Sequence, residues 1–415
     1  MKKTIFAACA VLSAAALHAA TPQASLDAAI IPGADIVGWG TGTHHDSQFY
    51  KQVDVLSKKF DAEMMARGMD AESAAWQKKF TAFETLMKNS GFSDENFDKD
   101  ASSVNFTKYF APLEGLLKEP PEPKMPSVGD IQILVAQSLK NPVADDLVQK
   151  LAPEIIAIFS DGKPFPYIAL ENFTHAGAKC VRLTVDIPVD DLPFPFSASP
   201  EISEFLKFKP FAAAVLGENK VVYVGTEEEV KAAIDRANAG QKTGLTPEIR
   251  ALVEGRVAGK NFLDYDDNMA WVFPDVFRKG LAKLEQIALS SGRLPPGMAP
   301  ALDAAKNSRG IRLVLSWGDT LDLTLNIVLD TPERAAGFRD FMDINALNMA
   351  KMLLFQARGK NTPLADSLKA VADGDSVSIK VTVGVGDVED FFGFIQKFNE
   401  ESPFLMNDDE DEDWD

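Results

Sequence analysis

Two runs of strict alternation between residues 311 and 329 constrain the fold more than any other feature of this sequence. Apolar side chains occupy every odd position from Ile311 to Trp317 and again from Leu321 to Leu329. A period of two is the signature of half-buried β-strands. A three-residue loop, 318–320, would pair Trp317 with Leu321 and place all the apolar side chains on one face. We therefore predict a hairpin whose apolar face is covered by helices.

A similar sequence occurs earlier in the chain. Residues 181–190, VRLTVDIPVD, match residues 321–330, LDLTLNIVLD, at four of ten positions, and both segments lead to a Pro-Glu pair that opens a helix. An internal duplication or a chance resemblance between amphipathic strands explains the match. The pattern predicts an α+β fold with two tandem units of antiparallel sheet covered by helices, residues 21–245 and 246–405, and a duplication would make the two units equivalent.

The N-terminal 20 residues have the composition of a secretory signal peptide. Lys2 and Lys3 precede an apolar run, and small residues end the segment at Ala19 and Ala20. We therefore predict a periplasmic or secreted protein. The rest of the sequence contains no apolar run of about 18 residues, so we expect no transmembrane segment.

The charge balance argues against a nucleic-acid partner, and the cysteine count excludes an intramolecular disulfide. Removing the first 20 residues takes away two lysines and no acid, which changes the formal charge from −19 to −21. Such a surface repels nucleic acid, so we expect no nucleic-acid partner. Cys180 is the one cysteine after residue 20, which excludes an intramolecular disulfide and predicts a structural thiol.

Several helices and loops are indicated between and after the strands. Apolar stripes predict a helical hairpin over residues 48–90, and the prolines of EPPEPKMP predict a loop at 119–126. A capping box of Thr226 and Glu229 marks the start of another helix. The last residues, 406–415, are strongly acidic and predict a disordered tail.

Three further local predictions follow from turn length and helical spacing. A four-residue loop at 174–177 would pair Leu170 with Val181 in a second hairpin. Helices over 332–358 and 387–399 should turn hydrophobic side chains toward the core. These side chains are Phe338, Phe341, Met342, Met349, Met352 and Leu353 in the first helix and Phe391, Phe394, Ile395 and Phe398 in the second.

His44, His45 and Asp46 form the one cluster of classical catalytic and metal-ligand types. Adjacent strand residues point to opposite faces, so both histidines would bind one metal ion only from a loop. The alternative is a polar strand end in which Asp46 or Ser47 caps the following helix. His175 is the one other histidine beyond residue 20.

Asp94, Asn96, Asp98 and Asp100 match the first four oxygen positions of an EF-hand calcium loop. Lys99 stands where the loop requires its turn glycine, and Asn105 stands where it requires a bidentate Glu. These departures make the calcium site weak. The histidine cluster is weak because a structural zinc site needs four ligands, so we expect neither a metal nor another cofactor.

The sequence contains no Gly-x-Ser-x-Gly, His-Glu-x-x-His or Ser-x-x-Lys motif. Phe- and Met-rich helices beside sheet units favour a binding role, because methionine adapts to varied apolar surfaces. We therefore predict a non-catalytic cell-envelope protein that binds a partner protein or an apolar ligand between sheet and helices. The alternative is a periplasmic hydrolase or metal-dependent enzyme that uses His44, His45 and Asp46.

Overall fold

The computed structural model describes residues 28–66, 71–111, 127–165, 167–188, 208–216, 220–241, 243–290, 299–358 and 363–401. Three predicted segments lie outside the described residues: the signal peptide of 1–20, the Pro-rich loop of 119–126 and the acidic tail of 406–415. The strands are β1 (Ile36–Gly40), β2 (Phe97–Asn105), β3 (Gln132–Leu139), β4 (Ile168–His175), β5 (Ala178–Val185), β6 (Phe211–Leu216), β7 (Val221–Thr226), β8 (Arg256–Val257), β9 (Lys260–Asn261), β10 (Asp267–Val272), β11 (Ser308–Trp317), β12 (Leu321–Leu329), β13 (Lys369–Asp373) and β14 (Ser376–Val383).

The helices connect and cover these strands. They are α3 (Gln48–Ala66), α4 (Ala71–Asn89), α5 (Thr107–Phe110), α6 (Leu147–Phe159), α8 (Glu227–Asn238), α9 (Pro247–Val253), α10 (Asp275–Ser290), α11 (Ala299–Asn307), α12 (Pro332–Phe341), the π-helix η8 (Met342–Leu347), α13 (Asn348–Arg358), α14 (Pro363–Ser367) and α15 (Val385–Glu401). Short 3₁₀ turns lie at η1 (Thr43–Asp46), η2 (Asp94–Asn96), η4 (Val128–Asp130) and η7 (Phe262–Asp264).

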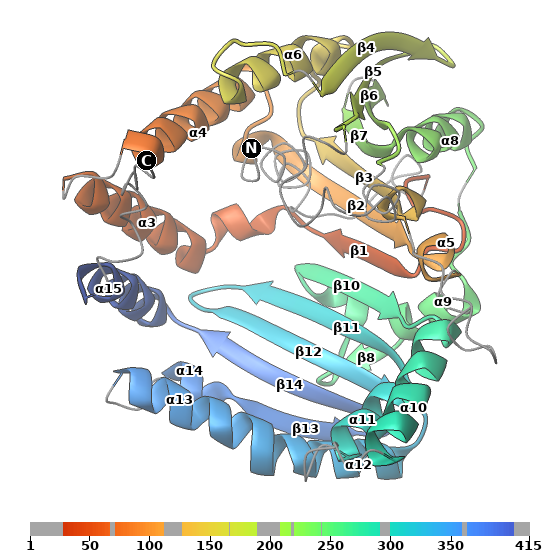
Figure 1. Ribbon diagram of the computed structural model, residues 1–415, viewed down its shortest axis with the longest axis vertical. Coiled ribbons are helices and arrows are strands. Elements are labelled where there is room, and N and C mark those ends of the chain that lie inside the picture. The colour runs from red at the N-terminus through yellow and green to blue at the C-terminus, as the bar shows by residue number, and fades with distance from the viewer. Residues whose placement is uncertain are drawn as a thin grey trace, which may run out of the picture.

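The fold is α+β, as predicted, and one antiparallel sheet of 12 strands runs through the molecule (Figure 1). The strand order is β13-β14-β12-β11-β10-β1-β2-β3-β7-β6-β5-β4. The predicted central hairpin is confirmed, because β11 and β12 pair Trp317 with Leu321 and Leu313 with Leu325 around the 318–320 loop. The two predicted units therefore share one sheet, joined where β1 pairs with β10.

The predicted equivalence of residues 181–190 and 321–330 is wrong. β5 has β4 and β6 as neighbours, whereas β12 lies between β11 and β14, so the two segments occupy different positions. The two halves nevertheless share a strand order when they are counted outward from the β1–β10 seam: β1-β2-β3-β7-β6 on one side and β10-β11-β12-β14-β13 on the other. The first half then adds β5 and β4 at its edge.

Helices cover both faces of the sheet. On one face, α8 and α9 contribute Val230, Ile234, Ile249 and Leu252 to a core that continues across the seam. On the other face, α6 packs on the first half and α12 with η8 packs on the second half, each over its own hydrophobic core. Because α6 and α12 follow the third strand of their halves, they occupy corresponding positions.

The hairpin of β4 and β5 has a shorter turn than predicted. His175 pairs with Ala178, which leaves Ala176 and Gly177 as a two-residue turn and pairs Leu170 with Leu183. Both turn residues have positive φ, 45° and 87°, as this tight hairpin turn requires. The register differs from the prediction by two residues, so each side chain keeps its predicted face.

The predicted capping box at the start of α8 does not form. The Thr226 hydroxyl lies 3.4 Å from the Ile133 backbone, and Glu229 accepts a hydrogen bond from Gln132 Nε2 at 2.5 Å. Contacts with β3 replace the local cap because the N-terminus of α8 packs directly beside that strand.

The predicted inward face of residues 332–358 is correct only in its first part. Phe338 is buried, but Met349, Met352 and Leu353 are 57%, 53% and 55% exposed. The π-helix η8 accommodates an additional residue per turn and rotates the following helix relative to an uninterrupted α-helix. Leu347 is buried as a result, and the methionines of α13 turn toward solvent.

The predicted helical hairpin of residues 48–90 forms two helices that pack mainly on other partners. Phe60 of α3 stacks on Phe392 of α15, with ring centroids 4.6 Å apart, and α4 packs along α6. Figure 1 shows α4, α3, α15 and α13 in succession along one side of the sheet. Phe391 and Phe394, predicted to face inward, are 53% and 51% exposed, because Phe392 makes the contact with α3.

Candidate functional site

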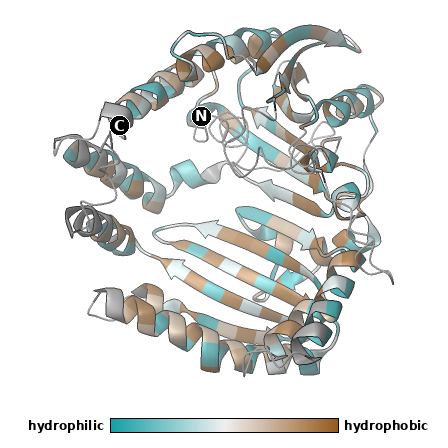
Figure 2. Cartoon of the chain, in the orientation of Figure 1, coloured by the Kyte–Doolittle hydropathy of each residue, from teal (hydrophilic) through white to brown (hydrophobic). Residues whose placement is uncertain are grey.

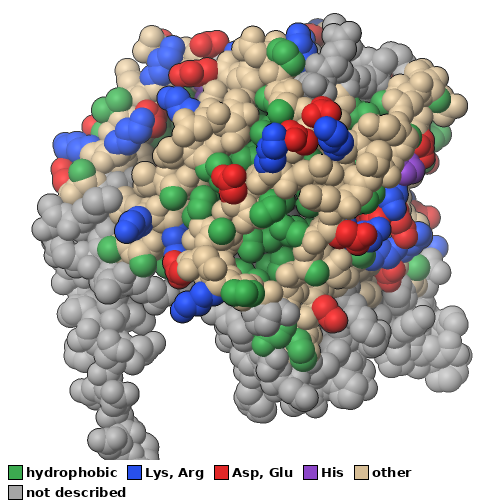
Figure 3. All heavy atoms as spheres, turned by 90° about the horizontal axis from the view of Figure 1, so that it is seen from above, with side chains coloured by type: hydrophobic (Ala, Val, Ile, Leu, Met, Phe, Trp, Pro, Cys, Tyr) green, Lys and Arg blue, Asp and Glu red, His purple; other side chains and the backbone are tan. Residues whose placement is uncertain are grey.

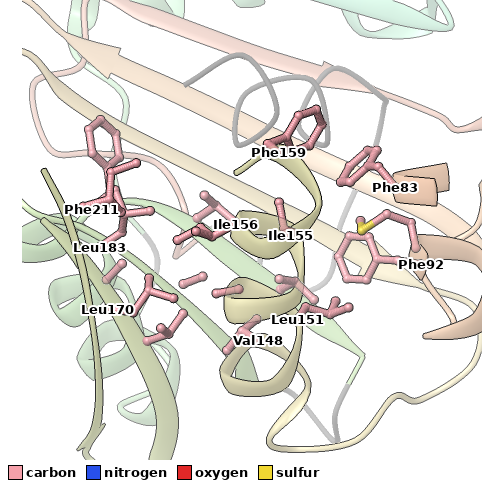
Figure 4. A pocket seen from close by; sticks show the side chains of 18 of the residues that line it. Phe83, Phe92, Val148, Leu151, Ile155, Ile156, Phe159, Leu170, Leu183 and Phe211 are labelled. Atoms are coloured by element: carbon pink, nitrogen blue, oxygen red, sulfur yellow. The ribbon is translucent and has the colours of Figure 1, made fainter. Parts of the chain in front are cut away.

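An apolar pocket lies between α6 and the outer strands of the first half-sheet (Figure 4). The sequence LVQKLAPEIIAIF gives α6 a hydrophobic stripe along its whole length. This stripe forms one wall through Val148, Leu151, Ala152, Ile155, Ile156 and Phe159.

The opposite walls come from the sheet and from α4. Phe83 and Met87 of α4 line the pocket beside Phe92, and the strands complete the lining with Ile168, Leu170, Val181, Leu183, Phe211, Ala212, Ala213, Val222 and Val224. Except for Ala212, which faces α8, these strand residues face α6 because side chains alternate between the faces of a sheet. Figure 3, which views the molecule from above Figure 1, shows hydrophobic side chains gathered near the centre of that view.

All the side chains that line this pocket are apolar, and the cavity measures about 110 Å³. An engineered apolar cavity of roughly 150 Å³ stays dry and takes up benzene, so a cavity of this kind attracts a small apolar group. A polar group placed inside would lose its hydrogen bonds to water without replacement. The pocket can therefore bind hydrocarbon, and its lining has no group for acid–base or nucleophilic chemistry.

An aromatic cluster closes the pocket at the C-terminal end of α6. The ring of Phe159 lies 6.1, 5.8 and 6.0 Å from those of Trp76, Phe80 and Phe83 of α4. Lys79 lies on the same helix, and its Nζ donates hydrogen bonds to Phe159 O at 3.2 Å and Asp161 Oδ2 at 2.8 Å. The Lys79 side chain, 17% exposed, thus lies beside Phe159 and outside the pocket lining.

No family model and no curated relative match this chain. Among solved structures, crystal form III of TP0453 has a TM-score of 0.34 at 9% identity, and the match covers 90% of this chain and 97% of that chain. Crystal form I of the same protein has a TM-score of 0.33 at 8% identity, with 91% and 98% covered. Similarities at this level carry no information about the site.

The structure places the predicted histidine cluster in a buried turn. His44 is 2% exposed, and its ring lies 3.6 Å from that of His45 and 5.5 Å from that of Trp317. Asp46 is exposed, and Ser47 Oγ accepts a hydrogen bond from Tyr50 N at the start of α3. His175 lies on edge strand β4, where its Nε2 is 3.0 Å from Asp235 Oδ1. The three histidines thus belong to two different environments.

The residues that resemble a calcium loop belong to a turn and a strand. Asp94 and Asn96 lie in η2, whereas Asp98 and Asp100 lie on extended β2. Asn96 Nδ2 donates a hydrogen bond to Gly91 O, and Asn96 Oδ1 accepts one from Asn141 N, so this side chain holds two loops together. Among the residues that the structure describes, no group of three His, Cys, Asp or Glu could hold a metal ion.

Asp100 and Asp267 flank Gly40 on opposite sides of β1. Asp100 is 5% exposed, and burial, together with the nearby Asp267 carboxylate, holds its pKa well above the usual value. Asp267 Oδ2 accepts a hydrogen bond from Trp317 Nε1 at 2.5 Å. One carboxylate therefore lies on each side of β1, at the seam between the halves of the sheet.

Cys180 is a buried structural thiol. It is 0% exposed, and burial raises its pKa, which disfavours the nucleophilic thiolate.

None of the described helices has the length and apolar character to cross a membrane.

The helix that builds the pocket, α6, was not predicted from the sequence as part of a site. The signal was present, since apolar residues at 147, 148, 151, 152, 155, 156 and 159 follow helical spacing. Its opposite wall depends on four strands that come together only in the folded sheet, so spacing alone does not reveal the pocket.

Proposed function

We propose that this is an exported, non-catalytic cell-envelope protein that binds an apolar ligand between α6 and the sheet. The observation that carries the proposal is the pocket whose lining is entirely apolar and whose walls come from α4, α6 and strands β4 to β7. Export rests on the composition of residues 1–20. Hydrocarbon burial is favourable at roughly 25 cal/mol per Å² of apolar surface removed from water, so such a site needs no polar contact for useful affinity.

A second candidate function, binding of a partner protein, is supported by a different surface. Seven large hydrophobic side chains of η8, α13 and α15 are at least half exposed: Ile344, Met349, Met352, Leu353, Phe355, Phe391 and Phe394. Contiguous exposed apolar patches are typical of interaction sites.

A pair of substitutions on α6 tests ligand binding in the pocket. Ala152 lines the pocket, whereas Ala157 lies on the exposed side of the same helix. Ala152→Phe should fill the cavity and abolish binding of the fluorescent probe N-phenyl-1-naphthylamine. Ala157→Phe adds the same side chain outside the pocket and should leave the fluorescence titration unchanged.

Two results would contradict the proposal: no saturable probe binding by the wild-type protein, or equal binding by the two variants. Native mass spectrometry of protein purified from its own host provides an independent check, because a resident ligand should be present in the wild type and absent from Ala152→Phe.

A further inference from the structure

We propose that two copies of this chain pair edge to edge through β4, antiparallel about a two-fold axis at Phe173, so that their two sheets form one continuous sheet. Three observations support the pairing: the difference between the two edges of the sheet, the direction of the backbone groups of β4, and the charge pattern on the α8 side of this strand.

The two edge strands of the sheet differ in how they are protected. At one edge, β13 has five residues, and its Ala370 N–H donates a hydrogen bond to Asp343 Oδ1 of η8 at 3.2 Å. Lys369 and Asp373 place charged side chains at the two ends of this strand. Short length, charge and cover by a neighbouring element prevent an edge strand from pairing with another chain. At the other edge, β4 has eight residues, and no strand of the described chain lies beyond it (Figure 1).

The backbone groups of alternate β4 residues point away from the sheet. Directly before the strand, Asp186 N donates a hydrogen bond to Tyr167 O. Hydrogen-bonded pairs alternate with non-hydrogen-bonded pairs along an antiparallel ladder, so the odd-numbered residues of β4 bond to β5. Leu170, Asn172 and Thr174 therefore direct their N–H and C=O groups outward, where no described strand meets them. These groups form a template with which a second strand can pair.

The side chains on one face of β4 carry a charge pattern that can complement itself. The ring centroid of Phe173 lies 5.0 Å from Lys231 Nζ of α8. His175 Nε2 lies 3.0 Å from Asp235 Oδ1 of the same helix, and Glu171 shares this face because strand side chains alternate. The Glu171 and His175 side chains are 62% and 28% exposed. An acid and a histidine thus lie symmetrically on either side of Phe173.

A two-fold axis at Phe173 brings this pattern against its own complement. The axis sets Phe173 opposite Phe173 of the second copy, and each Glu171 opposite His175 of the second copy. Asn172 and Thr174 then exchange backbone hydrogen bonds with their counterparts. Aromatic pairs and pairs of complementary polar groups are favourable across antiparallel strands. An axis at Glu171 would set two carboxylates against each other, and an axis at Asn172 would leave each acid opposite a phenylalanine.

Sedimentation equilibrium over a concentration series tests the pairing. The mass of the wild-type protein should rise with concentration from that of one chain toward that of two. Asn172→Pro removes an outward N–H and should keep the protein monomeric, because proline cannot donate to a neighbouring strand. Ala372→Pro makes the same change on β13, where Ala372 shares the outward direction of Ala370, and should leave the dimer intact. Circular dichroism melts show whether each variant is folded.

Disulfide cross-linking tests the position of the axis. The native Cys180 is buried, so an introduced thiol decides the outcome. Phe173→Cys places two thiols at the axis in a non-hydrogen-bonded pair, with Cα atoms about 4.5 Å apart, which a disulfide can span. Ala169→Cys lies exposed on the same face, but its counterpart would be roughly 26 Å away at about 3.3 Å per residue. Phe173→Cys should therefore cross-link on oxidation, and Ala169→Cys should not.

Several results would overturn the proposal. A wild-type protein that is monomeric at every concentration excludes the pairing, and so does a folded Asn172→Pro variant that still dimerises. Equal cross-linking of Phe173→Cys and Ala169→Cys, or a dimer in which Phe173→Cys does not cross-link, excludes the axis. If Asn172→Pro does not fold, selective cross-linking of a folded Phe173→Cys variant still decides the question, because that variant retains every backbone N–H of β4.

Discussion

The two halves of the sheet have the same strand order outward from the β1–β10 seam but differ in what they bury. On the α8 and α9 face, a row across the first half consists of Ala136, Tyr223, Ala214 and Cys180. A row across the second half on the same face consists of Ala270, Arg312, Asn326 and Ser378, and three of these four are polar. Equivalent topology therefore accommodates an apolar row in one half and a hydrogen-bonded polar row in the other.

The other face shows a second difference. α6 keeps its hydrophobic stripe directed at the sheet along its whole length and encloses the pocket. At the corresponding position, α12 is interrupted by η8, and α13 directs Met349 and Met352 toward solvent. Figure 2 shows hydrophobic residues distributed over both halves, so the difference lies in where the helices direct them. The first half encloses an apolar pocket, and the second half has exposed apolar side chains.

The largest expected effect comes from shortening one apolar side chain on α6 and comparing it with the same change on α13. Leu151→Ala on α6 removes a side chain that is 7% exposed and should lower the free energy of unfolding by about 2 to 5 kcal/mol. Met352→Ala on α13 removes one that is 53% exposed and should change it by less than about 0.5 kcal/mol. Urea denaturation measures both, and equal losses would mean that α13 is covered in solution.

The polar row of the second half gives the next largest effect. Asn326 is 1% exposed, and its Oδ1 accepts a hydrogen bond from Arg312 Nε at 2.8 Å. Asn326→Ala leaves a buried guanidinium with one acceptor fewer and should cost about 1 to 3 kcal/mol. Near the other end of β12, on the same face, Asp322→Ala breaks a half-exposed pair with Lys380 and should cost less than about 1 kcal/mol. The reverse order in denaturant melts would show that the polar row is not buried.

The seam between the halves should make stability depend on pH. The pKa of Asp100 is raised in the folded protein, so the folded state keeps this proton at pH values where the unfolded chain has released it. The free energy of unfolding therefore falls as pH rises through the window between the ordinary and the raised pKa. Asp100→Asn removes this loss and should be more stable than the wild type at neutral pH, by about 1 to 3 kcal/mol.

The comparison needs melts of both proteins across the acidic to neutral range. The difference should vanish below the ordinary pKa of an aspartate, where both side chains are neutral. A constant difference at every pH would indicate a packing effect of the substitution instead.

The smallest effect on stability concerns the apolar surface of the second half. Leu353 is 55% exposed, so Leu353→Gln should leave the melting temperature almost unchanged. The same substitution should reduce the fluorescence of the hydrophobic dye ANS when it is bound to the folded protein, because it removes part of the surface that the dye contacts. Dye binding that responds to Ala152→Phe but not to Leu353→Gln would place the accessible apolar surface in the first half alone.

Much of the local structure follows from the sequence because it depends on neighbouring residues. The 311–329 alternation and the three-residue loop predict the β11–β12 register correctly. Parity also predicted that Leu323 and Leu325 share a face. It did not predict burial: Thr324 and Asn326, on the polar face, are 4% and 1% exposed, whereas Leu323 and Leu325 are half-buried. The polar face is buried because α9 covers it, and its polar side chains form hydrogen bonds within the sheet.

The candidate site was only partly foreseeable. An apolar site between sheet and helices was expected, but the sequence pointed to the methionines of α13 and to the histidine cluster, and α6 was missed. Helical spacing in the sequence assumes an uninterrupted α-helix, and η8 changes the rotation of everything after it. The pocket also depends on β4 to β7 lying side by side, which involves pairings between distant segments.

By itself, the sequence determined the α+β class, the central hairpin and the positions of most helices, because these depend on periodicity and turn chemistry over a few residues. Only the tertiary structure decided that a single sheet joins both units, that β5 and β12 are not equivalent, and that α6 encloses a pocket. These features depend on which distant strands pair and which helix face meets them. Strand pairing and helix orientation depend on burial over the whole molecule, so no local pattern encodes them.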